Sequence, residues 1–397
     1  MLSSPNFRND KMYYFLVVLG ISSTAGLLGW RTLLNNFAVE VASIEGYQIG
    51  LIQGLREVPG FLTLLVVYLL LVMKEVKLAS LSIIIFGIGI GATGFLPSFY
   101  GILATTLLMS FGFHYYAALG QSLALQYYEE DTAPLVLGNI RAYSAAGSIA
   151  TALIIYFAAK KLSFAPMFLI IGIGIIATGV WGILRDPTNK DLIPQHNKMI
   201  LRKRYWLYYA LTFLSGSRRQ IFVAFAVFLL VEKFEYTVSQ ISLLFVITNI
   251  IVFFTSPQIG KAIVRFGERK VLSLEYVSLL LIFLVYATTD SKIIVGLMYI
   301  MDNLFFNFSM AINTFFQKIA DPQDMSASVS VGFTINHISA VAIPVIGGFI
   351  WMIDYRYTFI GGMVLAAVSL LLAQFVASQT RSGQAIRNSD RAISDSS

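Results

Sequence analysis

The chain is 397 residues long, and 57% of its residues are hydrophobic while only 12% are charged. Because a typical soluble domain carries about 25% charged residues, this composition excludes an ordinary soluble fold and indicates that the bilayer is the solvent. The sequence has no cysteine, which excludes disulfides and thiolate chemistry, and with only three histidines a multi-histidine metal centre is not expected. We therefore expect neither a metal nor a cofactor.

Twelve apolar stretches, separated by short polar breaks, are each long enough to cross a bilayer as a helix. The predicted spans cover residues 12–38, 47–73, 77–96, 100–126, 136–158, 164–184, 205–231, 238–258, 271–288, 292–317, 328–352 and 357–377. The polar N-terminus leads into the first span without a small-residue cleavage site, which indicates a retained helix rather than a signal peptide. The predicted fold class is an all-α integral membrane protein.

The distribution of lysine and arginine predicts the orientation in the membrane. With both termini in the cytoplasm, 18 of the 28 basic residues lie in cytoplasmic segments, five lie outside and five lie within spans. This bias is the positive-inside pattern, and it predicts a protein of the cytoplasmic (inner) membrane with both termini inside. Because the net charge of +7 is spread along one membrane face, we expect no nucleic-acid partner.

The longest internal polar segment divides the spans into two groups of six. We predict an N-terminal six-helix bundle over residues 1–184, a cytoplasmic linker over 185–204, a second bundle over 205–377 and a disordered tail over 378–397.

An internal repeat supports this division. In the first span, five residues lie between Arg31 and Phe37-Ala38-Val39. In the seventh span, five residues likewise lie between Arg219 and Phe225-Ala226-Val227. Spans five and eleven also correspond, since Leu137-Gly138 comes just before Arg141 and Val331-Gly332 just before Asn336 and His337. The matches occur in the same order in both halves and predict a duplicated six-helix unit.

Two adjacent arginines, Arg218 and Arg219, lie near the middle of the seventh span. A charge at bilayer depth costs roughly 2.5–3.5 kcal/mol on insertion scales, so it normally faces a bundle interior or a watery cavity. The planar fork of arginine suits carboxylate or phosphate, and we predict that Arg219 and Arg31 bind an anionic substrate. The alternative is that each pairs with a buried acid and holds helices together. Arg218 points about 100° away from Arg219 on the helix and fits that structural role better.

The loop between spans eight and nine, Gly260 to Lys270, resembles the cytoplasmic signature G-x-x-x-D-R-x-G-R-K of the major facilitator superfamily. Gly260, Arg265 and Gly267 match, and the basic residues Arg269 and Lys270 stand at the end of the signature, while Val264 replaces the usual Asp and Glu268 the usual Arg. The corresponding loop of the first half, residues 71–77, lacks the glycines and the acid at the signature position. The resemblance implies two pseudo-symmetric six-helix bundles around a substrate site near the bilayer midplane.

In this family spans one, four, seven and ten commonly line the central cavity. The pair Arg31 and Arg219 is also similar to the organophosphate:phosphate antiporter branch, in which an arginine from each half clamps the phosphate. Asn36-Phe37-Ala38 resembles the first-span motif of that branch, although Arg31 lies about one helical turn deeper. The resemblance thus implies that the two arginines face one cavity.

Other polar residues in the spans are further substrate-site candidates. Arg141 begins span five, where it could reach the cavity or pair with the acids at 129–131. His114 and Gln121 in span four are seven residues apart and share a helix face. With Asn336 and His337 in span eleven, they could hydrogen-bond a polar substrate or satisfy interhelical bonds. A histidine that titrates near neutrality could also couple transport to protons.

Three acids lie within or at the ends of spans. Glu57 in span two and Asp302 in span ten are candidates for proton coupling, because a desolvated carboxylate can exchange protons. The alternative is that they neutralise the buried arginines. Glu275 in span nine is predicted to be a structural partner of nearby basic residues. Asn303 and Asn307 share a face of span ten.

No Walker loop or pair of catalytic carboxylates is visible, so we do not expect an enzyme or an ATP-driven pump. The glycine-rich runs at 87–91 and 172–174 lie within apolar spans and are interpreted as helix-packing surfaces. The leading hypothesis is a monomeric secondary active transporter of a small anionic solute, an organic anion or organophosphate. It would work in the bilayer by alternating access, as a proton symporter or an antiporter. The alternatives are an exporter of drugs or amphiphilic compounds and a non-transporting membrane sensor.

Overall fold

The computed structural model describes residues 7–44, 46–188, 201–236 and 238–382, which contain helices and loops and no strand. Within these residues, twelve helical segments, some continuous and some interrupted, are long and apolar enough to cross a membrane. This confirms the prediction of an all-α membrane protein. The α-helices are α1 (Lys11–Glu40), α2 (Gly46–Leu55), α3 (Val58–Phe61), α4 (Val66–Leu69), α5 (Glu75–Thr93), α6 (Phe99–Tyr127), α7 (Ala133–Ala158), α8 (Phe164–Ile183), α9 (Trp206–Ile221), α10 (Val227–Glu232), α11 (Val238–Phe266), α12 (Glu268–Thr288), α13 (Lys292–Phe306), α14 (Met310–Ile319), α15 (Met325–Ile353) and α16 (Tyr355–Ala373).

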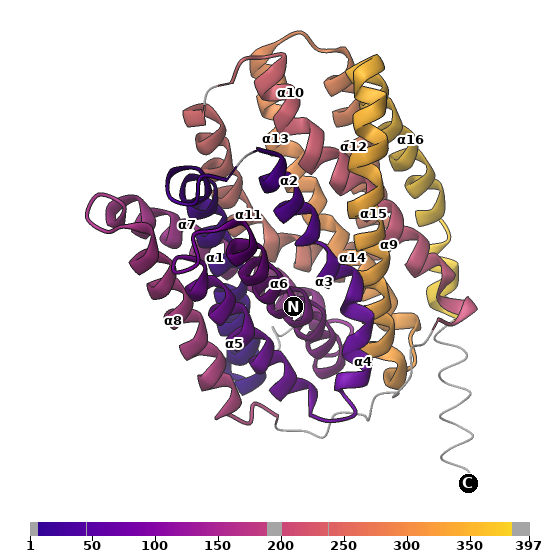
Figure 1. Ribbon diagram of the computed structural model, residues 1–397. Coiled ribbons are helices and arrows are strands. Elements are labelled where there is room, and N and C mark those ends of the chain that lie inside the picture. Colours follow the sequence, from indigo (N-terminus) through magenta and orange to yellow (C-terminus); the bar gives the residue numbers. More distant parts are fainter. Residues whose placement is uncertain (1–6, 45, 189–200, 237, 383–397) are drawn as a thin grey trace. The chain divides into compact units, whose positions relative to one another are not determined.

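Three of the spans are interrupted. The second span is α2, α3, the 3₁₀-helix η2 (Leu62–Leu65) and α4, which follow one another in line in Figure 1. The seventh span changes from α9 to the π-helix η4 (Phe222–Ala226) before α10, and the tenth has the 3₁₀-helix η5 (Asn307–Ser309) between α13 and α14. At such breaks, backbone N–H and C=O groups lose their helical hydrogen bonds and need other partners. Breaks of this kind are frequent at functional sites.

The break in the second span has an identifiable cause and an identifiable compensation. Pro59 lies in the first turn of α3 and has no N–H, so the helix of α2 does not continue through it. Thr334 of α15 compensates for the irregular backbone, because its hydroxyl donates to the carbonyl oxygen of Phe61 (3.0 Å) and accepts from the N–H of Leu64 (3.1 Å).

The described residues form two compact units. Unit 1 takes in residues up to 127, together with 139–199 and 326–334, and unit 2 takes in 128–138, 200–325 and 335 onward. The first residues of α7 thus belong to unit 2 and the rest of that helix to unit 1. In α15, residues 326–334 belong to unit 1 and those from 335 onward to unit 2. The predicted boundaries at 184, 204 and 377 remain predictions. The last helical segment continues to Ser382, and most of the predicted linker (189–200) and tail (383–397) lies outside the described residues.

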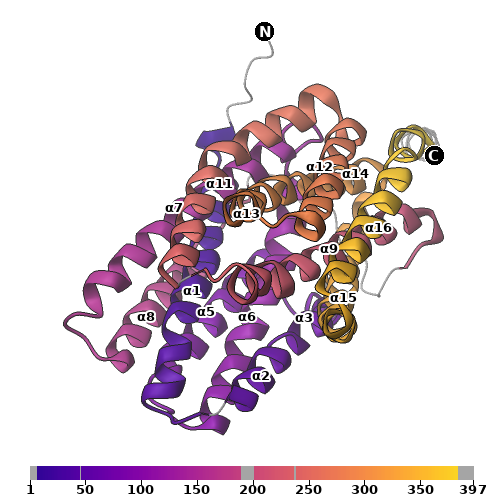
Figure 2. The same cartoon turned by 90° about the horizontal axis from the view of Figure 1, so that it is seen from above.

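Glycines allow the helices of unit 1 to pack closely. α5 lies between α6 and α8 (Figure 2), and a Cβ on Gly87 would come within 2.8 Å of the carbonyl oxygen of Gly172. On the other side of α5, a Cβ on Gly89 would lie 2.4 Å from the backbone nitrogen of Met109. The glycine runs are therefore helix-packing surfaces, as interpreted from the sequence.

Aromatic side chains fill the core of unit 2. The buried cluster is formed by α9 to α13 with α16 and includes Phe225, Phe283, Tyr286 and Phe359. Trp351 of α15 stacks on Phe225 with ring centroids 5.4 Å apart. This core surrounds the irregular part of the seventh span, so the π-helix is held on a packed surface.

The signature loop between α11 and α12 also has a physical explanation. Gly267 has φ +81°, a conformation that glycine adopts without steric cost. Glu268, which replaces the family's usual arginine, is buried and forms an ion pair with Nζ of Lys318 on α14 (2.9 Å). The reversed charge at 268 is thus matched by a lysine on the neighbouring helix.

Candidate functional site in unit 2

Arg219 lies in the last turn of α9, directly before the π-helix. Its Nη1 donates to Oδ1 of Asn303 on α13 at 3.4 Å. Its guanidinium carbon lies over two aromatic rings, 4.3 Å from the centroid of Phe306 and 5.0 Å from that of Phe222. Among the described residues, no carboxylate lies within ion-pair distance of it. The direct partners found for this membrane-embedded cation are therefore one neutral amide and two rings.

Both helices that contribute to this contact leave regular α geometry beside it. At the start of η4, the N–H of Phe222 bonds to the carbonyl oxygens of both Arg218 and Arg219. On α13, Nδ2 of Asn303 donates to the carbonyl oxygen of Tyr299 (3.1 Å), and Nδ2 of Asn307 donates to that of Asn303 (2.7 Å). Interrupted membrane helices with polar groups at the break are a recurring way to build transporter binding sites.

Asp302 precedes Asn303, and its buried carboxylate forms no ion pair within the described part of the chain. Its side chain is 2% exposed, and Oδ2 has no hydrogen bond within the described part of the chain. The charged and titratable groups that act on it electrostatically are Arg218 and Arg219 of α9, Tyr286 of α12 and Tyr299 of its own helix. A buried carboxylate without an ion-pair partner is costly as an anion. The role of Asp302 in proton coupling stays a prediction.

Arg218 has a different environment from its neighbour. Its Nη2 lies 3.5 Å from Oε1 of Glu275 on α12, and both side chains are almost completely buried. Nη1 donates to the hydroxyl of Ser369 on α16, and the guanidinium carbon lies 4.4 Å from the ring centroid of Tyr276. Arg218 therefore joins α9, α12 and α16, which favours the structural role. Glu275 is a structural partner as predicted, but of Arg218 rather than of the basic residues near the end of its own helix.

Asn336 of α15 also lies next to α9. A Cβ on Gly216 would be 2.9 Å from Nδ2 of Asn336, so this glycine makes room for the amide. One turn further on, the hydroxyls of Ser217 and Ser339 are 3.1 Å apart. His337 follows on α15 and is partly exposed. The structure thus brings Asn336 to the helix that carries Arg219, while a substrate role for Asn336 and His337 stays a prediction.

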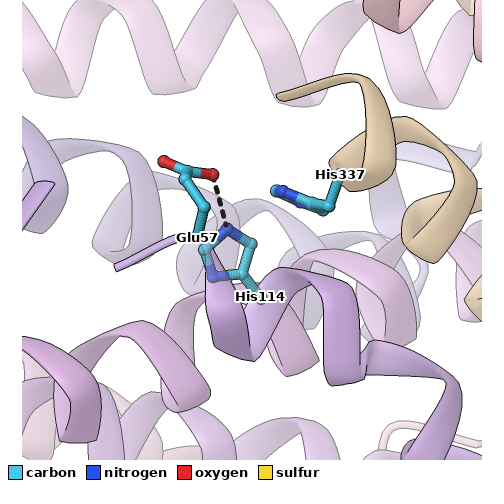
Figure 3. Close-up of side chains that lie close together, drawn as sticks. All are labelled: Glu57, His114 and His337. Carbon is cyan, nitrogen blue, oxygen red and sulfur yellow. Dashed lines mark ion pairs between the residues drawn. The ribbon is translucent and has the colours of Figure 1, made fainter. Parts of the chain in front are cut away.

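In unit 1, Glu57 and His114 come together at the break in the second span (Figure 3), with Oε2 and Nε2 3.9 Å apart. Nη2 of Arg56 also contacts Oε1 of Glu57 at 2.5 Å. On a continuous helix adjacent side chains diverge and need not pair. Here Arg56 and Glu57 form the interruption between α2 and α3, and their side chains meet. The hydroxyl of Ser110, 2.9 Å from Nδ1 of His114, donates to the carbonyl oxygen of Arg56 (2.5 Å).

The remaining candidates also belong to unit 1. Arg31 is exposed on α1, Gln121 is partly exposed on α6, and Arg141 is partly exposed on α7. Their substrate roles, and the pairing of Arg31 with Arg219 across one cavity, stay predictions.

Sequence reasoning missed the direct contacts of Arg219. It placed Asn303 and Asn307 on one face of span ten but assigned them no partner. Two amides four residues apart in an apolar helix were the available signal. Nothing in the sequence singles out Phe222 and Phe306 among 31 phenylalanines.

Several solved structures are similar to this chain in fold. A bacterial homologue of the iron transporter ferroportin has a TM-score of 0.73 at 12% identity, over 92% of this chain and 99% of that one. The E. coli fucose:proton symporter has a TM-score of 0.70 at 13% identity, covering 92% and 98%. The human organic anion transporter MFSD10 has a TM-score of 0.70 at 12% identity, covering 93% and 99%. At these identities the likeness concerns the fold alone.

The sequence itself carries the family relationship. A search of the curated protein sequences gives no match. Residues 12–344, however, match the sequence profile of the Major Facilitator Superfamily, which is well over half of the chain. With twelve membrane-spanning helices in this fold, the chain belongs to the major facilitator superfamily of membrane transporters.

Proposed function

We propose that the protein is a secondary active transporter that moves a small anionic solute across the cytoplasmic membrane by alternating access, with Arg219 as an anion-binding residue. One observation carries this proposal. Arg219 is embedded in the membrane with only neutral groups in direct contact, whereas its neighbour Arg218 is paired with the carboxylate of Glu275. An arginine needed only for packing would be stabilised by an acid, as Arg218 is. An incoming anion can supply the missing negative charge at Arg219.

The proposed coupling ion is a proton carried by Asp302. With the site empty, the nearest counter-charge for Arg219 is the carboxylate of Asp302, which acts on it without direct contact. When an anion occupies Arg219, that stabilisation weakens and Asp302 binds a proton more readily, so substrate and proton bind together. This is symport by mutual neutralisation. Anion exchange is the alternative mechanism, because one anion can replace another on Arg219 without any protonation.

Counterflow in proteoliposomes tests the proposal. The full chain is reconstituted and assayed with a panel of organic anions, sugar phosphates and neutral analogues. We expect uptake of at least one class of anion, strongly reduced in Arg219→Lys, because lysine keeps the charge but loses the planar fork. Lys261→Gln, which removes an exposed charge from α11, is the matched control and should transport normally. Unchanged apparent affinity in Arg219→Lys would refute the assigned role.

A further inference from the structure

We propose that the site at Arg219 selects monovalent carboxylates with an apolar body, in preference to phosphate esters and dianions. This inference rests on the proposed function and specifies its substrate class. It is carried by three features of unit 2: the number of available positive charges, the directions from which the guanidinium can be reached, and the side chains around it.

The first feature is charge. In the interior of unit 2, the charge of Arg218 is balanced by Glu275 and that of Lys318 by Glu268. Arg219 is also an interior cation of this unit, but no carboxylate among the described residues is in contact with it. Asp302 acts on it from nearby and reduces the positive potential further. In a medium of low dielectric constant, one cation can balance one negative charge, whereas a dianion would keep an uncompensated charge.

The second feature is access. The guanidinium carbon lies over the rings of Phe222 and Phe306, so aromatic carbon covers it there. We infer that an anion is bound along the N–H edge, in the plane of the group, where the donors of the guanidinium point. A carboxylate is planar and can accept two parallel hydrogen bonds in that plane. A tetrahedral phosphate would direct further oxygens out of the plane, toward ring carbons that donate no hydrogen bond.

The third feature is the wall of the site. The ring of Phe222 stacks on that of Tyr299 with centroids 4.9 Å apart. The ring centroids of Phe305 and Phe308, at the interruption of the tenth span, are 5.5 Å apart. The amide nitrogen of Asn303 already bonds to the backbone of Tyr299. The surroundings therefore present aromatic surface and few additional donors, which suits an apolar ligand body and leaves extra phosphate oxygens unsatisfied.

Three probes with the same ring separate these features: benzoate (a carboxylate monoanion), phenylphosphonate (a tetrahedral anion) and phthalate (a carboxylate dianion). Binding to the purified full chain is measured at one pH as ligand-induced thermal stabilisation, with benzamide as the neutral control. We expect benzoate to bind at least tenfold more tightly than either of the others. Phe306→Leu should reduce this preference for benzoate over phenylphosphonate, because it opens the covered side of the guanidinium while leaving its charge.

The outcomes distinguish this inference from the proposed function. Tighter binding of phenylphosphonate or phthalate, abolished by Arg219→Gln, would overturn the carboxylate selectivity and leave anion transport through Arg219 standing. Binding of anions that Arg219→Gln does not weaken, or no binding of any anion at millimolar concentration, would overturn both. If Arg219→Gln does not fold, Asn303→Ala replaces it, since this variant keeps the arginine and removes its hydrogen-bond acceptor. Several-fold weaker benzoate binding is then expected, and unchanged binding counts against the site.

Discussion

Arg218 and Arg219 are adjacent in the sequence, yet the regions around them differ in every respect that matters for a buried charge. The two helices that contact Arg218, α12 and α16, are regular, and they contribute a carboxylate, a hydroxyl and an aromatic ring. Around Arg219 the backbone changes to a π-helix and a 3₁₀-helix, and the direct contacts are neutral. The comparison shows that the first arginine joins helices, and it supports the proposal that the second binds a ligand.

The largest expected effect concerns stability at Arg218. Glu275→Gln leaves the arginine buried without its carboxylate, which should destabilise the protein by about 3–5 kcal/mol. Thermal unfolding in detergent and the yield of inserted protein measure this. Combining Glu275→Leu with Arg218→Leu should restore much of the stability, because a buried ion pair can be replaced by apolar side chains at little net loss. Glu275→Gln with normal stability would show that the pair does not hold the helices together.

Arg219 should show the reverse pattern. Arg219→Gln is expected to retain the unfolding temperature within a few degrees, since no buried carboxylate loses a direct partner. Its affinity for a transported anion should fall by about 10- to 100-fold, the equivalent of roughly 1.5–3 kcal/mol for a hydrogen bond to a charged group. Anion affinity and unfolding temperature, measured on the same preparation, check the two expectations. A loss of stability equal to that of Glu275→Gln would place Arg219 with Arg218 as a structural residue.

Asp302 extends the comparison from the arginines to the two buried carboxylates. Glu275 is paired, whereas Asp302 is proposed to gain and lose a proton. Asp302→Asn should therefore abolish accumulation driven by a pH gradient and leave anion exchange within about twofold, because exchange needs only Arg219. Both assays use the same proteoliposomes, and wild type is the reference. If pH-driven accumulation survives the substitution, the coupling group lies elsewhere, and Glu57 and His337 are the next candidates.

The smallest expected effect lies at an exposed ion pair. Nζ of Lys233 is 2.8 Å from Oδ1 of Asp290. The hydrogen bond and the charge of Lys233 lower the pKa of the Asp290 carboxyl. A lowered pKa means that the contribution to stability is present above the ordinary aspartate pKa and disappears as the pH falls through the lowered value. Between pH 5 and 8, Asp290→Asn should leave the unfolding temperature unchanged within error, because exposed pairs contribute little. A large shift there would show that exposed and buried pairs of this protein do not differ as proposed.

The sequence alone determined the number of spans, their approximate limits and the membrane-embedded position of the arginines. These properties depend on hydropathy along about 20 consecutive residues, because the bilayer has a set thickness and every span must satisfy its own backbone. The role of the glycine runs was also predicted from the sequence, since close helix contact requires residues without a bulky side chain. Local physical rules thus predicted the elements and the general class of the protein.

Only the tertiary structure decided which polar side chains meet. Glu275 is 57 residues from Arg218, and Asn303 is 84 residues from Arg219. Contacts at such separations depend on which helix faces pack together, and an apolar bilayer span of low amphipathicity does not reveal its packed face. The interruptions of the second and seventh spans also contributed, because a break in a helix changes the relative directions of the side chains on its two sides. The partner of each buried charge therefore follows from helix packing, which the local sequence does not specify.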